Sequence, residues 1–188
     1  LPESAGDHFL AIPGPMPPPS PNAIRVQAYA SVLENEPNNQ WTNATVYAGE
    51  APVAFNGIIN TEGDVDWFSF DAKQGQNLMA HIYARRLHTS LDSVIAIKGP
   101  GGDDIQQNDD ANGLDSGIAF VAPSNGQYSI HVRDKLSKGR KDFVYRLEIT
   151  FEEHSFSISL PSFDQRNLQY RHKVNVSRGN SFALPFMI

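Results

Sequence analysis

The sequence predicts an all-β protein built as an antiparallel, jelly-roll-like β-sandwich. Short segments alternate between apolar and polar side chains, which is the period-two pattern of a strand with one buried face. Turn-forming Gly, Pro, Asn and Ser residues separate these segments. The chain also has 11 Phe, six Tyr and two Trp beside 14 Gly and 13 Pro, a composition that favours many short strands over a helical bundle.

The first 30 residues are expected to be a proline-rich linker or the tail of a preceding domain. Residues 1–21 hold seven of the 13 prolines, which favours polyproline II and disfavours a place in a sheet ladder. Residues 24–30 alternate weakly, so they are either the last strand of a preceding domain or the first strand of this one. A helical turn or two is expected only around residues 39–47.

The following strands are expected where the alternation is clear. Their inward side chains are Phe68 and Phe70, Leu78 to Ala84 at alternate positions, the run 94–97, Ile118 and Phe120, Tyr128 to Val132 at alternate positions, and Phe143, Tyr145, Leu147 and Ile149. Turns are expected at residues 73–76, 98–103, 123–126 and 137–140. His81 and His131 fall on the opposite faces and are predicted to be surface histidines.

The sandwich is expected to span residues 31–153. Residues 154–188 alternate again, which predicts either the start of a following β domain or extra strands of the same sandwich. Because the chain starts without Met and ends in an apolar run, we expect it to be a piece of a longer protein.

The composition argues against several classes of protein. A net charge of −6 disfavours a nucleic-acid surface, which needs clustered Lys and Arg. The absence of Cys excludes disulfides, thiolate metal sites and a cysteine nucleophile. No apolar run reaches the roughly 20 residues of a membrane span. No recognisable arrangement of nucleophile, base and orienting residue is present, so we predict no catalytic residues.

Several motifs together resemble a bacterial pre-peptidase C-terminal domain. The first are an E-x-E-P-N segment at residues 34–38 and a G-D-x-D-W-F-x-F segment at residues 63–70. The similarity continues, in the family's order, through residues 91–97, 108–110, 113–116, 122–134 and 145–149. It covers about residues 31 to 152, and the ordered set carries the resemblance because each motif is short.

The resemblance implies a β-sandwich accessory module of the kind appended to secreted peptidases, related to the collagen-binding domains of bacterial collagenases. The expected function is therefore a non-catalytic module of a larger exported bacterial protein. It would bind an extracellular polymer, either protein or glycan, or space neighbouring domains of the same chain. The expected location is secreted, at the cell surface or periplasmic.

Acidic and amide side chains before two strands predict a calcium site. Calcium takes six to eight oxygen ligands from carboxylates, amides, carbonyls and water. The candidate ligands are Glu34, Glu36, Asn38, Asn39, Asp64 and Asp66. The matching segment of the collagenase relatives ligates calcium, although Asn39 stands where those relatives carry a carboxylate, which removes one negative ligand. The alternative is that Glu34 and Glu36 are solvated linker residues and that Asp64 caps a turn.

A second, weaker metal candidate lies in the loop before residue 116. Its oxygens come from Asn108, Asp110, Asn112 and Asp115, with a spacing that imitates the start of an EF-hand loop. The closing Glu of an EF-hand would fall at Ala119, inside an expected strand, so a true EF-hand is excluded. Asn, Asp and Gly also favour turns for conformational reasons alone, and this interpretation is preferred.

Three aromatic residues are predicted to face outward and to form a flat ligand surface: Trp41, Trp67 and Tyr83. The alternative is that they pack against the flanking linker or the next domain. Two other functions stay open. The first is a hydrolase fragment using Asp64, Asp66, Asp109 and Asp110, and the second is a purely structural spacer.

Overall fold

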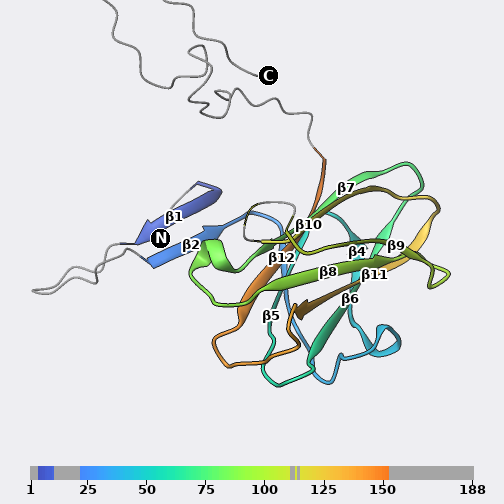
Figure 1. Cartoon of the computed structure of the whole chain (residues 1–188). Coiled ribbons are helices and arrows are strands. Elements are labelled where there is room, and N and C mark those ends of the chain that lie inside the picture. Colours follow the sequence, from blue (N-terminus) through green and yellow to red (C-terminus); the bar gives the residue numbers. More distant parts are fainter. Residues whose placement is uncertain (1–3, 11–21, 111–112, 114, 153–188) are drawn as a thin grey trace, which may run out of the picture. The chain divides into compact units, whose positions relative to one another are not determined.

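The computed structural model describes residues 4–10, 22–110, 113 and 115–152 (Figure 1). Residues 1–152 make one compact unit. The β segment predicted for residues 154–188 lies outside the described residues, and so does the densest proline run, residues 13–21. Within the described part no helix has the length and apolar character needed to cross a membrane.

Two five-stranded sheets pack face to face, which confirms the predicted all-β sandwich. The first sheet has the order β10-β7-β12-β5-β3 and the second has the order β4-β6-β11-β8-β9. The strands of the first sheet are β3 (Ala30–Leu33), β5 (Val53–Ile58), β7 (Asn77–Tyr83), β10 (Gly117–Val121) and β12 (Val144–Phe151). Those of the second are β4 (Thr45–Glu50), β6 (Val65–Ala72), β8 (Ser93–Lys98), β9 (Asp104–Asn108) and β11 (Gly126–Asp134).

The inward side chains predicted from the alternation form the core between the sheets. Along β11, Tyr128, Ile130 and Val132 are fully buried, as expected for one face of a pleated strand. The rings of Phe55 on β5 and Phe68 on β6 stack across the two sheets with their centroids 4.7 Å apart. Two of the predicted turns are also present: Gly75 and Gly102 have φ angles of 83° and 84°, the left-handed region that favours glycine. The turn predicted at residues 137–140 lies instead at residues 135–136.

The sandwich is mostly antiparallel, but two of its strand pairs are parallel, which the sequence did not predict. β3 pairs with β5 in the first sheet, and β4 pairs with β6 in the second. The chain alternates between the sheets from β3 to β6, so each of these pairs is separated by a strand of the opposite sheet. β3 and β4 lie at the edges of their sheets, next to the acidic segment that connects them.

The predicted linker over residues 1–30 contains two strands. β1 (Gly6–Leu10) and β2 (Asn22–Val26) pair with each other as an antiparallel two-stranded sheet. Both strands lie outside the proline run, where backbone N–H groups remain available for a ladder. The helical turn expected at residues 39–47 is a single 3₁₀ turn, η1 (Trp41–Asn43), followed at once by β4. A second 3₁₀ turn, η2 (Arg85–Leu87), follows β7.

Candidate metal centre

Four carboxylates gather where the chain passes between the two sheets. Glu34 and Glu36 lie in the connection from β3 to β4, and Asp64 and Asp66 lie at the start of β6. We call Glu34, Glu36, Asp64 and Asp66 the acidic cluster. One carboxylate oxygen from each of Glu36, Asp64 and Asp66 lies within 4.8 Å of the others. The structure therefore brings together carboxylates from two segments about 30 residues apart.

The segment of Glu34 and Glu36 is fixed to β5 and β6 by main-chain contacts. The amide of Glu34 donates to the carbonyl of Asn56, and the amide of Trp67 donates to the carbonyl of Asn38, both at 2.9 Å. The Glu34 carboxylate accepts from the Ile58 amide at 3.1 Å, and Asp64 accepts from the Asn60 amide at 2.8 Å. These bonds hold Glu34 and Asp64 in the folded sandwich, and the bond from Asn60 is the turn contact that the alternative predicts for Asp64, whereas Glu36 is exposed.

Two oxygen atoms at this site are buried without a hydrogen-bond donor: Oδ1 of Asp66 and Oδ1 of Asn38. Both residues are fully buried. Among the described residues, no Lys, Arg or His forms an ion pair with any carboxylate of the acidic cluster. Buried oxygens that lack a donor and buried carboxylates that lack a cation are costly, and a bound metal ion satisfies both requirements.

Asn39 has a smaller part in this arrangement than Asn38. Its side chain is exposed, and its amide Nδ2 lies 3.4 Å from Oδ1 of Asp64 as a donor. Asn38 instead donates through Nδ2 to the hydroxyl of Thr45, which leaves its Oδ1 directed elsewhere. Of the two predicted amide ligands, Asn38 is therefore the one whose side-chain oxygen is buried without a hydrogen-bond donor.

Two residues that the sequence did not indicate as site residues complete the acidic cluster. The hydroxyl of Tyr145 on β12 donates to Oδ2 of Asp66 at 2.6 Å. A Cβ at Gly57 would overlap the Glu34 carboxylate and the Tyr145 hydroxyl, so the absence of a side chain at this position makes room for both. Tyr145 was predicted only as an inward residue. A buried tyrosine hydroxyl needs a polar partner, and this requirement is the signal by which Tyr145 could have been found from the sequence.

Burial shifts the acid–base equilibria of the acidic cluster. Burial raises the pKa of Asp66, and the neighbouring charge of Glu34 raises it further, although the hydrogen bond from Tyr145 lowers it. Burial likewise raises the pKa of Glu34, which lies within hydrogen-bonding reach of Asp66. Without a cation, burial therefore favours the protonated form of both carboxyl groups.

The second metal candidate is not assembled in the structure. The buried carboxylate of Asp115 accepts from the amides of Arg85 and Arg86 at 2.8 and 3.2 Å, and so it caps η2. Asp110 lies 3.6 Å from the ammonium of Lys135. Asn108 accepts from the amide of Gly117, and Asn112 lies outside the described residues. Contacts with η2, with Lys135 and with the start of β10 thus occupy Asp115, Asp110 and Asn108.

The acidic residues considered for a hydrolase separate into two places. Asp64 and Asp66 are buried within the acidic cluster. Asp109 pairs with Lys135 at 2.7 Å in the loop after β9. The structure therefore does not join them into one acidic pair flanking a cleft.

The predicted flat aromatic surface is corrected by the structure. Trp67 and Tyr83 are only 8% and 7% exposed, whereas Trp41 is 48% exposed. The ring of Trp67 packs edge-on against His131, and the guanidinium of Arg25 on β2 lies 3.8 Å from the centroid of Tyr83. Both aromatics do point away from the core, but other groups cover them: Tyr83 packs against the preceding segment, as the alternative proposed, whereas Trp67 packs against His131 of the sandwich itself.

The prediction of surface histidines is likewise wrong for His131. Its ring contacts Trp67 with centroids 4.5 Å apart, and both ring nitrogens are buried without a hydrogen-bond partner. Burial lowers the pKa of His131 to about 4, and the charges of Arg133 and Lys98 act in the same direction. His81 on β7 is partly buried, and burial lowers its pKa as well. An outward position on a strand does not make a residue solvent-exposed when a loop lies over it.

The fold and the acidic cluster define a β-sandwich module, and comparison with known proteins specifies which kind. Residues 64–134 match the family model of the bacterial pre-peptidase C-terminal domain. This match confirms, for residues 64–134, the resemblance given by the ordered motifs. The match begins at Asp64, so it includes the Asp64 and Asp66 half of the acidic cluster.

A probable subtilase-type serine protease of Deinococcus radiodurans is 35% identical over 118 residues, which make up 57% of this chain and 16% of the protease. The chain thus spans about a sixth of that relative's length. Two solved structures are also similar. The pre-peptidase C-terminal domain of a collagenase from Bacillus anthracis has 15% identity and a TM-score of 0.45, covering 57% of this chain and 94% of that one. The periplasmic g-type lysozyme inhibitor PliG of Aeromonas hydrophila has 17% identity and a TM-score of 0.43, covering 65% and 100%.

Proposed function

We propose that residues 31–153 form a non-catalytic accessory module of a larger exported bacterial protein, and that calcium bound at the acidic cluster stabilises this module. The accessory role is supported by the match of residues 64–134 to the pre-peptidase C-terminal domain family. The calcium role is carried by one observation. Four carboxylates gather at one place, Oδ1 of Asp66 among them is buried without a donor, and no cationic side chain of the described residues pairs with them.

The chemistry of the donors fits a hard cation. All the candidate ligand atoms are oxygens, which suits calcium and magnesium, whereas zinc prefers nitrogen and sulfur. Glu34, Glu36, Asp64 and Asp66 would supply carboxylate oxygens, and Asn38 would supply its side-chain carbonyl oxygen. The bound ion would offset the repulsion among the carboxylates and join the connection between β3 and β4 to the start of β6. Its role is therefore structural.

The module would bind an extracellular polymer or space neighbouring domains. Trp41 supports the binding role, because it is the one residue of the three predicted aromatics that stays exposed. Its ring lies close to Gly102, where an added Cβ would be 3.6 Å from the indole. An exposed indole on a rigid turn offers a flat apolar face for a sugar ring or a peptide.

Thermal unfolding in calcium and in a chelator tests the metal role. An ion that binds only the folded state at about 100 times its Kd adds about 2.7 kcal/mol, which corresponds to about 5–10 °C in Tm for a chain of this size. We expect Asp64→Ala to remove this shift. The matched control is Asp134→Asn. Asp134 is as buried as Asp64, but its carboxylate caps the amides of Leu136 and Lys138.

The control should lower Tm equally in calcium and in chelator, and so it should keep the calcium shift. Identical melting curves of the unsubstituted chain with calcium and with chelator would contradict the metal role. A shift that survives Asp64→Ala would instead place the ion elsewhere. Neither result bears on the accessory role, which binding and turnover assays of the isolated chain test separately.

A further inference from the structure

The hairpin formed by β1 and β2 is attached to the sandwich by side chains and not by a strand ladder. The two strands pair only with each other, in a separate two-stranded sheet. Among the described residues, no backbone hydrogen bond joins either strand to the two five-stranded sheets. A two-stranded hairpin is marginally stable by itself in water, so its position depends on its side-chain contacts.

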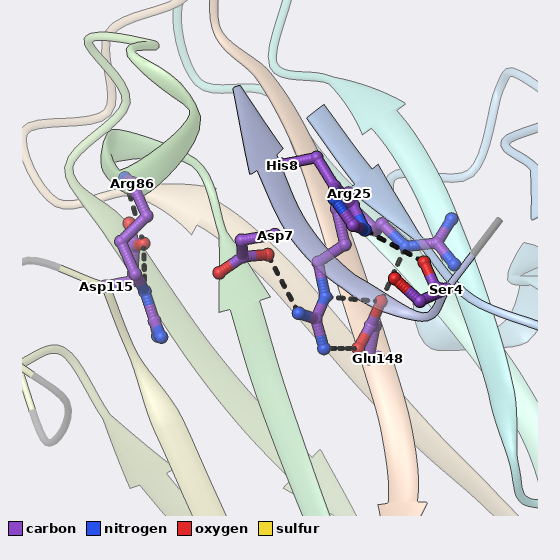
Figure 2. Close-up of polar contacts among 8 residues, drawn as sticks. Ser4, Asp7, His8, Arg25, Arg86, Asp115 and Glu148 are labelled. Atoms are coloured by element: carbon purple, nitrogen blue, oxygen red, sulfur yellow. Dashed lines mark hydrogen bonds and ion pairs between the residues drawn. The ribbon is translucent and has the colours of Figure 1, made fainter. Parts of the chain in front are cut away.

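One ion pair provides the main polar contact (Figure 2). Arg25 of β2 reaches Glu148 of β12 with two parallel bonds, from Nε at 2.9 Å and from Nη2 at 2.7 Å. Its third nitrogen bonds Asp7 of β1 at 2.8 Å, so one guanidinium ties both strands of the hairpin to the first sheet. The bidentate geometry is the strongest form of such a pair.

Glu148 is buried although it lies on the outer face of the first sheet. Its side chain is 2% exposed and that of Arg25 is 12% exposed. The neighbouring position on the same face of β12 is Arg146, whose Nε also donates to Glu148, at 2.7 Å. If the hairpin left, Glu148 would keep Arg146 and regain water. Separation of the hairpin from the first sheet therefore leaves no buried charge without a partner on that sheet.

The hairpin covers an aromatic residue without filling the space beneath it. The Arg25 guanidinium lies over the ring of Tyr83, and Arg86 of η2 lies 4.8 Å from the same ring. A hollow of about 350 Å³ remains there, lined by Ile24, Arg25, Tyr83, Leu87, Val144 and Arg146 among others. The contact is thus incompletely packed, which lowers the free energy needed to separate the two surfaces.

We propose that the β1–β2 hairpin is a reversible strap, held closed over Tyr83 by the Arg25–Glu148 pair, and that its opening exposes Tyr83 and the hollow as a surface of the module. The closed strap explains why Tyr83 is buried on an outward position of β7. It also explains why a glutamate on the outer face of a sheet is shielded from water. The ion pair of the strap is distinct from the acidic cluster, because neither Arg25 nor Glu148 belongs to that cluster, although Tyr145, which donates to Asp66, also lines the hollow.

Amide hydrogen exchange with mass spectrometry tests the strap in the intact chain. We expect the amides of β1 and β2 to exchange at least 100-fold faster than those of β6 and β11, because the strap opens without global unfolding. Arg25→Met keeps the aliphatic stem but removes the pair. It should speed exchange in β1 and β2 at least tenfold and leave β6 and β11 unchanged. Nitration of Tyr83 by tetranitromethane should rise in parallel.

The matched control is Arg140→Met. Arg140 also pairs with a carboxylate, Asp142 at 2.7 Å, and also lies over a ring, that of Phe143. It should change neither exchange in the strap nor nitration of Tyr83. The double variant Arg25→Met/Glu148→Gln tests whether the Arg25–Glu148 pair is the contact that holds the strap closed. Its exchange in β1 and β2 should be no faster than that of the faster single variant, because both substitutions break one interaction.

Three results would overturn the proposal. The first is exchange of β1 and β2 as slow as that of β6 and β11, which would make the hairpin part of the cooperative core. The second is unchanged exchange in Arg25→Met. The third is an exchange rate in the double variant that rises by the product of the two fold-increases seen in the single variants. That result would mean that Arg25 and Glu148 act through separate contacts.

Discussion

The hydroxyl of Tyr145 donates a 2.6 Å hydrogen bond to Oδ2 of Asp66, and these two buried residues come from opposite sheets. The bond joins β12 to β6 across the core of the sandwich. The hydrogen bond from Tyr145 also lowers the pKa of Asp66, and so it favours the ionised form of this carboxyl group. Tyr145 thus connects the core of the sandwich to the proposed metal centre.

Tyr145→Phe tests this link. The loss of a donor to a buried carboxylate should cost about 1–3 kcal/mol in the free energy of unfolding. We expect the loss to be larger in calcium than in chelator, since a cation requires the ionised carboxylate that the hydroxyl stabilises. Chemical denaturation in both conditions measures the difference. Tyr128→Phe is the control, because its buried hydroxyl donates to the Ser124 carbonyl, and its effect should not depend on calcium.

Gly57→Ala tests the space beside the acidic cluster. The added Cβ would overlap Glu34 and Tyr145, so the substitution should destabilise the fold by about 1–3 kcal/mol and reduce the calcium-dependent shift in Tm. Gly99→Ala is the control. A Cβ there would lie at an ordinary 3.6 Å from Ile105, so the change should not exceed about 1 kcal/mol. Equal effects of the two substitutions on the calcium shift would argue against a specific role of Gly57.

Calcium affinity should depend on pH. Because burial raises the pKa of both Asp66 and Glu34, the free cluster holds a proton that the ion must displace. The apparent affinity should therefore rise with pH, by up to about tenfold per unit for one displaced proton. Calorimetric titration in two buffers of different ionisation enthalpy measures the protons released. A pH-independent affinity without proton release would show that the pair is already ionised.

His131 should make the fold less stable in acid. Its folded pKa of about 4 lies below its ordinary value of 6.5, so the unfolded chain takes up the proton first. Above pH 6.5 the ring is neutral in the folded and the unfolded chain, so His131 does not lower the free energy of unfolding. Between pH 6.5 and 4 this free energy falls by on the order of 3 kcal/mol, because only the unfolded chain takes up the proton. His131→Phe should remove this part of the pH dependence. Denaturation of both chains at several pH values measures it, and parallel curves would contradict the assignment.

Trp41→Ala tests the proposed contact surface. Because the indole is 48% exposed, its removal should barely change stability but should weaken cosedimentation of the chain with an insoluble polymer such as collagen, cellulose or peptidoglycan. Leu136→Ala is the control, since Leu136 is 69% exposed in a different loop. Failure of the unsubstituted chain to bind any of these polymers would favour the structural spacer.

The sequence by itself determined the strands where the alternation is clear, with their inward faces, and the two halves of the acidic cluster, but it did not indicate β4, β5 or β9. A period of two is a local property, so Tyr128, Ile130 and Val132 could be assigned to the core from their spacing alone. The same holds for the acidic residues before β4 and β6, which the family's ordered motifs identify. These features depend on residues within a few positions of one another.

The tertiary structure decided what covers each outward face. The alternation placed Trp67, Tyr83 and His131 outward, but it carries no information about a loop or hairpin that lies over them. The pairs Tyr145–Asp66 and Arg25–Glu148 join residues 79 and 123 positions apart. Contacts over such separations follow from how the sheets and the hairpin pack. For this reason they could be found only once the chain was folded.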